Sequence, residues 1–327
     1  MPPGRKTTGA GYMAEAQREQ NGRQVAAGHI PVLLNEAMNI LNIKRGNVYV
    51  DGTLGGGGFS EEILRRLHKG GFLIGIDRDA EAVKNAQSEF EGKFDNKNFK
   101  LFHSNFSKID EIVKAEGLAG IDGVVLDLGI SSIQLEGGRG FSFNEEGTGA
   151  AGGGLDMRMD TENSLTAYDV INGYPEKNLA DIIYKFGDEK FSRRIAKRII
   201  EYRKNKPVET SLELADIVRK AVYRSYGKFK KFKTDPATKT FMALRIFVNK
   251  EYDSLAEFLE KLKNVLNKGG IAAIISFHSG EDRLVKHFLK NNLDFKPLNK
   301  KPIVPGDEEI KNNPRSRSAK LRAFYHV

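Results

Sequence analysis

The sequence predicts an α/β fold whose doubly wound, largely parallel sheet is interrupted by a helical insert. Short apolar runs alternate with segments of helical apolar spacing over residues 48–127, which is the pattern of β-α-β units with right-handed crossovers. The alternation stops over about 136–235, where helical spacing dominates, and it resumes from about 253. The first apolar run ends in Asp51 and a cluster of glycines. Strand, glycine turn and helix in that order hold nucleotide-like cofactors in open α/β sheets.

The expected elements follow one another in chain order. Each helix has apolar residues three or four positions apart, and each strand is a short apolar run. The strand 123–127 is apolar as far as its final aspartate, which is typical of a strand buried within a parallel sheet. The expected strands are 48–51, 72–77, 99–103, 123–127, 271–277 and an edge strand at 319–327. The expected helices are 32–43, 59–68, 79–90, 109–116, 178–186, 189–204, 211–226, 253–267 and 280–291.

The same patterns divide the chain into domains. Residues 1–28 are polar with mixed charge and predict a disordered tail. Residues 29–135 and 236–327 form one sheet domain, which is predicted to bind a cofactor, and residues 136–235 form a helical domain inserted within it. The run 147–154 is mostly glycine and alanine, a composition that predicts a flexible link.

The composition narrows the classes of function. The 327 residues contain no cysteine, which excludes disulfides, zinc–thiolate sites and a cysteine nucleophile and fits a reducing compartment. No apolar run approaches the roughly 20 residues of a membrane span, and the N-terminus lacks the apolar segment of a signal peptide. We therefore expect a cytoplasmic protein with no membrane partner, and we assign it no metal. The net charge of +9 indicates either a polyanionic partner such as RNA or DNA, or ordinary solubility charge.

The position of Asp77 helps to identify the cofactor. It ends the second strand about 20 residues after the glycines, where such sites place the carboxylate that binds ribose hydroxyls. NAD and S-adenosylmethionine (SAM) both suit this arrangement, and three features favour SAM. The glycines cluster at Gly52 and Gly55–Gly58 instead of following G-x-G-x-x-G spacing. The fourth strand ends in a polar turn at 127–132, and the chain closes with a further strand.

Separate blocks of sequence, in one order along residues 29–327, carry a resemblance to a known family. The blocks are HIPVLLNE at 29–36, DGTLG at 51–55, LDLGISS at 126–132, QL at 134–135, RGFSF at 139–143, LDMRMD at 155–160, PATKTF at 236–241, ALRI at 243–246, SFHS at 276–279, EDR at 281–283 and PRSRSAKLR at 314–322. With these blocks the chain resembles the bacterial small-subunit ribosomal RNA cytosine-N4 methyltransferases, the RsmH/MraW family.

The resemblance implies a Rossmann-like class I SAM-dependent methyltransferase sheet with an inserted all-helical domain that recognises the substrate. It implies transfer of a methyl group to the N4 amine of one cytidine in 16S rRNA, at the decoding centre of the small ribosomal subunit. The oligomeric state is left open, with a homodimer as one candidate. The implied cofactor contacts are Gly55, Gly57, Gly58, Phe59, Asp77 on the ribose, Phe106 beside the adenine, Asp127 and Gln134.

Three positions depart from the family pattern. Phe59 stands where the family has histidine, which removes one polar contact to the cofactor. Ile133 replaces proline, which loosens the turn after Ser132. Gly280 replaces leucine, so we expect a lost packing contact in the helix behind the last strands.

Asp127 and His278 are the candidate catalytic residues. A carboxylate that accepts a hydrogen from the cytosine amine would localise its lone pair, and Asp127 lies at the cofactor edge of the predicted sheet. Alternatively, Asp127 contacts SAM or caps the following turn. His278 follows the fifth predicted strand and either contacts the base or has a structural role. Because methylation at cytosine C5 normally requires a thiolate, the absence of cysteine favours an exocyclic nitrogen or a ribose oxygen as the target.

Three basic groups are candidates for RNA binding, alongside two phenylalanines that could clamp a flipped base. Phe141 and Phe143 either form this clamp or pack in the core. Basic side chains with aromatic neighbours hold phosphates and stack bases, although a solvated helix face explains the first group equally well. The three groups are Arg193, Arg194, Lys197, Arg198, Arg203 and Lys204; Lys228, Lys230, Lys231 and Lys233 with Phe229 and Phe232; and Arg315, Arg317, Lys320 and Arg322.

Three other functions compete with this one. An NAD-dependent dehydrogenase shares the glycine turn and Asp77. A ribosome-assembly factor with a vestigial SAM fold would bind RNA without turnover, and the altered Phe59 keeps it open. A DNA amino-methyltransferase is disfavoured, because Leu128-Gly129-Ile130 is not the proline-proline-aromatic turn of those enzymes.

Overall fold

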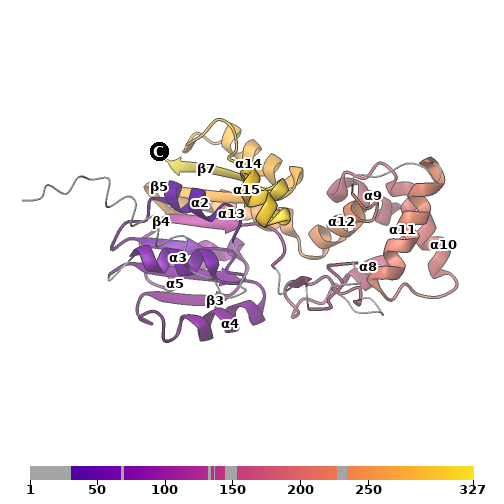
Figure 1. Cartoon of the computed structure of the whole chain (residues 1–327), viewed down its shortest axis with the longest axis horizontal. Coiled ribbons are helices and arrows are strands. Elements are labelled where there is room, and N and C mark those ends of the chain that lie inside the picture. Colours follow the sequence, from indigo (N-terminus) through magenta and orange to yellow (C-terminus); the bar gives the residue numbers. More distant parts are fainter. Residues whose placement is uncertain (1–30, 68–69, 132–133, 136, 144–152, 227–233) are drawn as a thin grey trace, which may run out of the picture.

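The computed structural model describes residues 31–67, 70–131, 134–135, 137–143, 153–226 and 234–327. Figure 1 shows a sheet with helices on both faces and, beside it, a second group of helices. The predictions for the tail 1–28, for residues 147–152 of the glycine-rich run and for the basic cluster 228–233 fall outside the described residues.

One sheet of seven strands has the order β3-β2-β1-β4-β5-β7-β6. Neighbouring strands are parallel except at β7, which pairs antiparallel with both β5 and β6. The strands are β1 (Val48–Asp51), β2 (Phe72–Asp77), β3 (Phe99–His103), β4 (Ile121–Asp127), β5 (Leu266–Ser276), β6 (Phe295–Pro297) and β7 (Lys320–His326). The predicted fold class is confirmed. The placement of the C-terminal strand at the edge is wrong, because the short β6 lies outside it.

Two helical layers cover the sheet, each over its own apolar core. Residues next to one another on a strand face opposite cores, as Tyr49 and Val50 of β1 do. One core contains Met38 of α2 and Ile63 of α3, and the other contains Phe258 of α13. The first layer is α2 (Leu34–Leu41), α3 (Gly58–Leu67) and α4 (Ala80–Phe90). The second is α5 (Ile109–Ala115), α13 (Glu251–Val265) and α14 (Ser279–Asn291).

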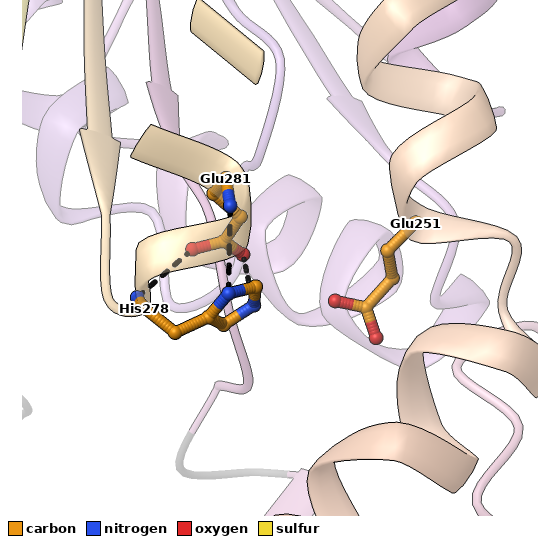
Figure 2. Close-up of side chains that lie close together, drawn as sticks. All are labelled: Glu251, His278 and Glu281. Carbon is orange, nitrogen blue, oxygen red and sulfur yellow. Dashed lines mark hydrogen bonds and ion pairs between the residues drawn. The ribbon is translucent and has the colours of Figure 1, made fainter. Parts of the chain in front are cut away.

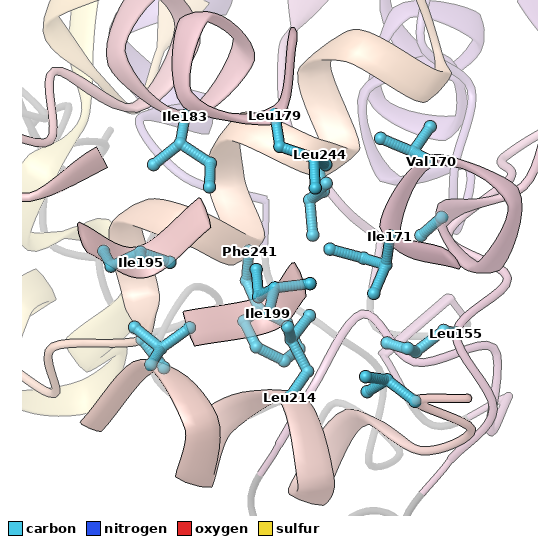
Figure 3. Packing of buried hydrophobic residues seen from close by; sticks show 14 of the residues in the cluster. Leu155, Val170, Ile171, Leu179, Ile183, Ile195, Ile199, Leu214, Phe241 and Leu244 are labelled. Carbon is cyan, nitrogen blue, oxygen red and sulfur yellow. The ribbon is translucent and has the colours of Figure 1, made fainter. Parts of the chain in front are cut away.

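The second group of helices surrounds a separate apolar core. Its helices are α8 (Ala167–Gly173), α9 (Glu176–Gly187), α10 (Ser192–Arg203), α11 (Ser211–Tyr226) and α12 (Thr238–Val248). Figure 3 shows Leu179, Ile199, Leu214 and Phe241 converging from four of them. The predicted division of the chain at residue 235 stays a prediction. It assigned α12 to the sheet domain, whereas Phe241 and Leu244 of α12 are buried in the helical core.

The junction between the two bodies lies between α12 and α13. Lys250 has φ +50° there, which turns the chain from one helix into the next. Arg245 of α12 spans the turn, with Nε 2.7 Å and Nη2 2.8 Å from the carboxylate oxygens of Glu251. The amide of Asn249 donates to the carbonyl of Met157 and accepts from the N–H of Met159, at 2.7 Å each. The segment 153–160, called the strap below, is therefore fixed to the junction.

The chain ends in short elements that close the sheet. α15 (Asp307–Asn312) and the 3-10 helix η2 (Pro314–Ser318) precede β7. Within the part of the chain that the structure describes, no helix combines the length and apolarity needed to cross a bilayer.

Candidate active site

A cleft of about 1360 Å³ opens at the carboxyl ends of the parallel strands. Side chains after β1, β2, β3 and β4 line one side of it, and the ends of α12, α13 and β5 line the other. In an open α/β sheet ligands bind at this edge, because the helix N-termini and the ends of several strands meet there. The lining residues include Gly55, Asp77, Phe106, Asp127 and Gln134, all of which were predicted from the sequence.

The glycine turn is built for close backbone approach. Gly55 and Gly57 have φ of +48° and +79°, which side chains rarely tolerate. A Cβ at Gly52 would collide with the side chain of Leu126. Gly55, Gly58 and the buried Phe59 line the cleft, whereas Gly57 faces the ring of Phe90 instead. The turn requires Gly57 for its conformation.

Asp51 organises this turn from beneath. Its side chain is fully buried and accepts hydrogen bonds from the Ser60 hydroxyl at 2.7 Å and the Thr53 N–H at 3.2 Å. Burial raises the pKa of Asp51 to about 6, although these hydrogen bonds act to lower it. Asp51 does not line the cleft, so its role is to hold the turn.

Asp77 lies at the end of β2 with both carboxylate oxygens in use. Oδ2 accepts the N–H of Gly55 and Oδ1 accepts the N–H of Asp79, at 2.8 Å each. Burial raises the pKa of Asp77, while these two hydrogen bonds lower it. The carboxylate therefore links the glycine turn to the start of α4, and each oxygen retains a further lone pair for a ligand.

A buried network behind Asp77 was not predicted. Asp79 accepts from Arg139 Nη2 at 2.5 Å and from Gln134 Nε2 at 3.3 Å. Arg139 also donates to the carbonyls of Arg158 and Met159 at 3.2 Å each, and Met159 lines the cleft. Gln134 is thus placed in the pocket through Asp79. The network joins the cofactor edge of the sheet to the strap.

Asp127 ends β4 with one carboxylate oxygen unsatisfied. Oδ1 is buried and has no hydrogen-bond partner among the described residues, and the backbone N–H of Asp127 donates to Thr53 Oγ1 at 2.6 Å. Burial raises the pKa of Asp127 well above its ordinary value, and the nearby carboxylates of Asp51 and Glu281 raise it further. Buried polar atoms are rarely left without a partner, so this oxygen marks a place for a ligand donor.

His278 lies beside the cleft and caps α14. Its Nδ1 accepts from the N–H of Glu281 at 3.5 Å, and its Nε2 lies 3.1 Å from Glu281 Oε1 (Figure 2). Glu281 is buried and its Oε2 accepts the N–H of Phe277 at 2.9 Å. Burial raises the pKa of Glu281, but the hydrogen bond and charge of His278 and the charge of Arg245 lower it overall. Phe277 and Glu281 line the cleft, whereas His278 does not.

Glu251, His278 and Glu281 bring ligand atoms within 4.8 Å of one another (Figure 2). Arg245 already forms a two-pronged ion pair with Glu251. Because its guanidinium supplies the positive charge that a metal ion would bring, we assign no metal to this cluster.

Packing explains why position 280 is glycine, which the sequence did not reveal. A Cβ at position 280 would collide with Oη and Cζ of Tyr252, whose ring also lies 5.6 Å from that of Phe186. The contact expected to be lost with the family's leucine is therefore replaced by Tyr252. Burial and the charges of Glu281 and Glu251 raise the pKa of Tyr252 to about 12.

The two phenylalanines proposed as a base clamp do not line the cleft. Phe141 is buried in the helical core, and Phe143 packs against it with its ring 4.6 Å from that of Phe241. Of the two alternatives, the structure supports core packing. Among the described residues, the aromatic side chains that do line the cleft are Phe59, Phe106 and Phe277.

The predicted basic groups differ in whether their side chains are already paired within the protein. Arg193, Arg194 and Lys197 on α10 are exposed and make no ion pair with a described residue. Arg203 points inward and donates to the carbonyls of Ile171 and Tyr174 at 2.5 and 2.6 Å. Near the C-terminus, Arg322 lies 2.6 Å from Asp282 in an ion pair. The exposed face of α10 is therefore the best-supported part of the predicted RNA surface.

Comparison with known proteins identifies the family. The match to the MraW methylase family spans residues 26–327. Ribosomal RNA small subunit methyltransferase H of Caldicellulosiruptor bescii is 44% identical over 318 residues, covering 91% of this chain and 99% of that protein. The protein of the same name from Hydrogenobaculum sp. is 46% identical over 295 residues, covering 90% and 94%. A solved rRNA methylase from Streptococcus thermophilus aligns over 90% of this chain and 93% of its own, with a TM-score of 0.41 and 10% identity. The chain belongs to the MraW methylase family.

Proposed function

We propose that this protein transfers a methyl group from SAM to the N4 amine of a cytidine in 16S rRNA of the small ribosomal subunit. Family membership over residues 26–327 is the observation that carries the proposal, because the relatives are named as ribosomal RNA small subunit methyltransferases. Neither the dehydrogenase nor the vestigial assembly factor is supported by that match. A cytoplasmic location and a homodimer stay predictions.

The residues of the cleft fit SAM. The glycine turn leaves room for main-chain contact, and Gly55, Gly58 and Phe59 line it. Asp77 would hold the ribose hydroxyls, and Phe106 would flank the adenine from the short 3-10 helix that follows β3. Gln134 would complete the pocket from above Asp79. Asp127 lines the cleft, and its unsatisfied Oδ1 would accept a hydrogen bond from the ligand as the last predicted contact.

The reaction requires the protein to position the cytosine amine beside the methyl group and to accept a proton from it. When bound, SAM supplies a strongly electrophilic methyl group. The amine of cytosine is a poor nucleophile, and a carboxylate that accepts its hydrogen localises the lone pair. After methyl transfer the amine must lose one proton, and a carboxylate with a raised pKa is a better acceptor for it than an ordinary one. Asp127 is therefore the proposed acceptor for the amine hydrogen.

His278 has a different proposed role. Its ring is engaged with Glu281 at the start of α14 and does not line the cleft. It would act as a positioning residue that fixes the segment after β5, next to Asp127. Loss of His278 should destabilise the protein, because Glu281 is buried and a buried carboxylate without its partner is costly.

The ribosomal RNA would be held partly by α10. Exposed Arg193, Arg194 and Lys197 lie on one face of the helix and are free to contact phosphates. The cluster 228–233, which lies outside the described residues, stays a second predicted contact.

Purified small subunits and radiolabelled SAM test the proposal. The wild-type protein should transfer label to 16S rRNA, and nucleoside analysis should recover N4-methylcytidine. Asp127→Ala should lose most of this activity. Label in another nucleoside, or none at all, would refute the proposed reaction. Calorimetry with SAM and with NAD separately should give binding only to SAM.

A further inference from the structure

Phe277 is the one aromatic side chain lining the cleft, among the described residues, that was not a predicted site residue. Phe106 begins the 3-10 helix η1 (Phe106–Lys108) that follows β3, on the side predicted to hold the adenine, and its ring meets Phe258 edge-on at 5.6 Å. Phe59 is buried beneath the glycine turn, with 3% of its surface exposed. Phe277 follows β5 and is only partly buried. It is the one described aromatic residue lining the cleft on the β4–β5 side.

Phe277 is adjacent to the candidate acceptor for the amine hydrogen. Asp127 of β4 is paired with Ile275 of β5, and the N–H of Leu128 donates to the carbonyl of Ile275 at 3.0 Å. Just beyond the ends of these two strands, Phe277 and Gly129 come together. A ring and a carboxylate with an unsatisfied oxygen therefore share one edge of the sheet.

The backbone around Phe277 is shaped to keep the ring in place. Gly129 has φ +133°, and a Cβ there would lie 3.4 Å from Phe277 Cδ2, so the ring packs directly on the glycine backbone. From the other side, buried Glu281 accepts the N–H of Phe277 at 2.9 Å. A ring fixed in this way loses little conformational entropy when a planar ligand stacks on it.

We propose that Phe277 provides the stacking face for the flipped-out cytosine, with the amine of the base directed toward Asp127. The inference rests on the proposed function and adds a substrate-contacting residue to it. An aromatic ring is needed because a base that leaves its RNA stack must recover the stacking it gives up. The helical core, which contains Phe141 with Phe143 packed against it, cannot supply that ring to the cleft. Phe277 divides the cleft into a cofactor end, at Asp77 and Phe106, and a base end.

Substitutions at the two ends of the cleft test this division. Phe277→Leu should lower kcat/KM for small subunits roughly 5- to 150-fold, the range for the loss of one base–aromatic stack. Its affinity for SAM, measured by calorimetry, should stay within about twofold of the wild type. Phe277→Tyr should restore most of kcat/KM, because the ring is kept. Phe106→Leu is the matched control, and it should weaken SAM binding.

A second variant changes the glycine on which the ring of Phe277 packs. Gly129→Ala keeps Phe277 but strains the backbone on which the ring packs, because Gly129 has φ +133°, and it should also lower kcat/KM with SAM affinity retained. This variant serves if Phe277→Leu does not fold, as judged from its thermal midpoint. Unchanged kcat/KM in Phe277→Leu, or a parallel loss of SAM affinity, would overturn the stacking role alone. A wild-type protein that makes no N4-methylcytidine would overturn both the stacking role and the proposed function.

Discussion

The ion pair between Arg139 and Asp79 offers the sharpest test of how the cleft is held together. Arg139 is 15% exposed and Asp79 is 6% exposed, and their closest atoms are 2.5 Å apart. Arg139→Gln removes the charge and shortens the side chain, which breaks the link to Asp79 and to the carbonyls of the strap at Arg158 and Met159. The sheet edge and the strap then lose their direct connection.

The size of the effect follows from burial. Removing one partner of a buried ion pair costs about 3–5 kcal/mol, because the other charge is left without compensation. Asp79 would keep the N–H of Glu81 at 3.2 Å and the amide of Gln134 at 3.3 Å, so we expect a smaller loss, about 2–3 kcal/mol. Arg158→Gln is the matched control. Its partner Asp156 is 28% exposed, so breaking that pair should cost about 1 kcal/mol.

Thermal unfolding and SAM calorimetry measure these losses. Arg139→Gln should lower the unfolding midpoint by several degrees and should weaken SAM binding, because the N–H of Asp79 holds Asp77 at 2.8 Å. A double-mutant cycle with Asp79→Asn should give a coupling free energy of about 2 kcal/mol. A coupling free energy near zero, or an Arg139→Gln protein as stable as Arg158→Gln, would show that this ion pair does not hold the cleft together.

Three further predictions address packing, pH and RNA. Gly280→Ala should destabilise by about 1–3 kcal/mol through collision with Tyr252, whereas Gly173→Ala, with no neighbour near its Cβ, should be neutral or stabilising in the same thermal assay. The pKa of Asp51 is raised to about 6, so the folded state favours its protonated form and Asp51 stabilises the fold most at low pH. Relative to Asp51→Asn, the free energy of unfolding of the wild type should fall by up to about 3 kcal/mol between pH 4 and 6 and then level off. Lys197→Glu should weaken RNA binding and its salt dependence together, as filter binding at several salt concentrations would show.

Local patterns were sufficient to predict the sheet apart from the short β6, and several of the residues that line the cleft. Each apolar run from β1 to β4 is bounded by polar residues, and parallel topology then brings the ends of those strands to one edge. Asp77 and Asp127 could be placed beside the glycine turn for that reason alone. The family and the fold predicted from the sequence are confirmed.

Side chains that act through distant partners could not be predicted in the same way. Arg139 and Asp79 are 60 positions apart and meet only because the segment that contains Arg139 folds back onto the start of α4. Tyr252 explains Gly280 only once α13 and α14 are packed together. One missed element did carry a local signal: Thr166 and Asp169 form a capping box at the start of α8, and that spacing is visible in the sequence.

The position of α12, just after the predicted boundary at residue 235, matters for the cleft. α12 follows the change in composition, yet Phe241 and Leu244 pack with the insert, so the two bodies meet at Lys250. Arg245 and Glu251 stand on either side of that turn, form one ion pair and both line the cleft. The wall of the cleft thus contains the joint between the bodies. A movement of α8–α12 relative to the sheet would therefore be felt first at Arg245, which lines the same cleft as Phe277 and Asp127.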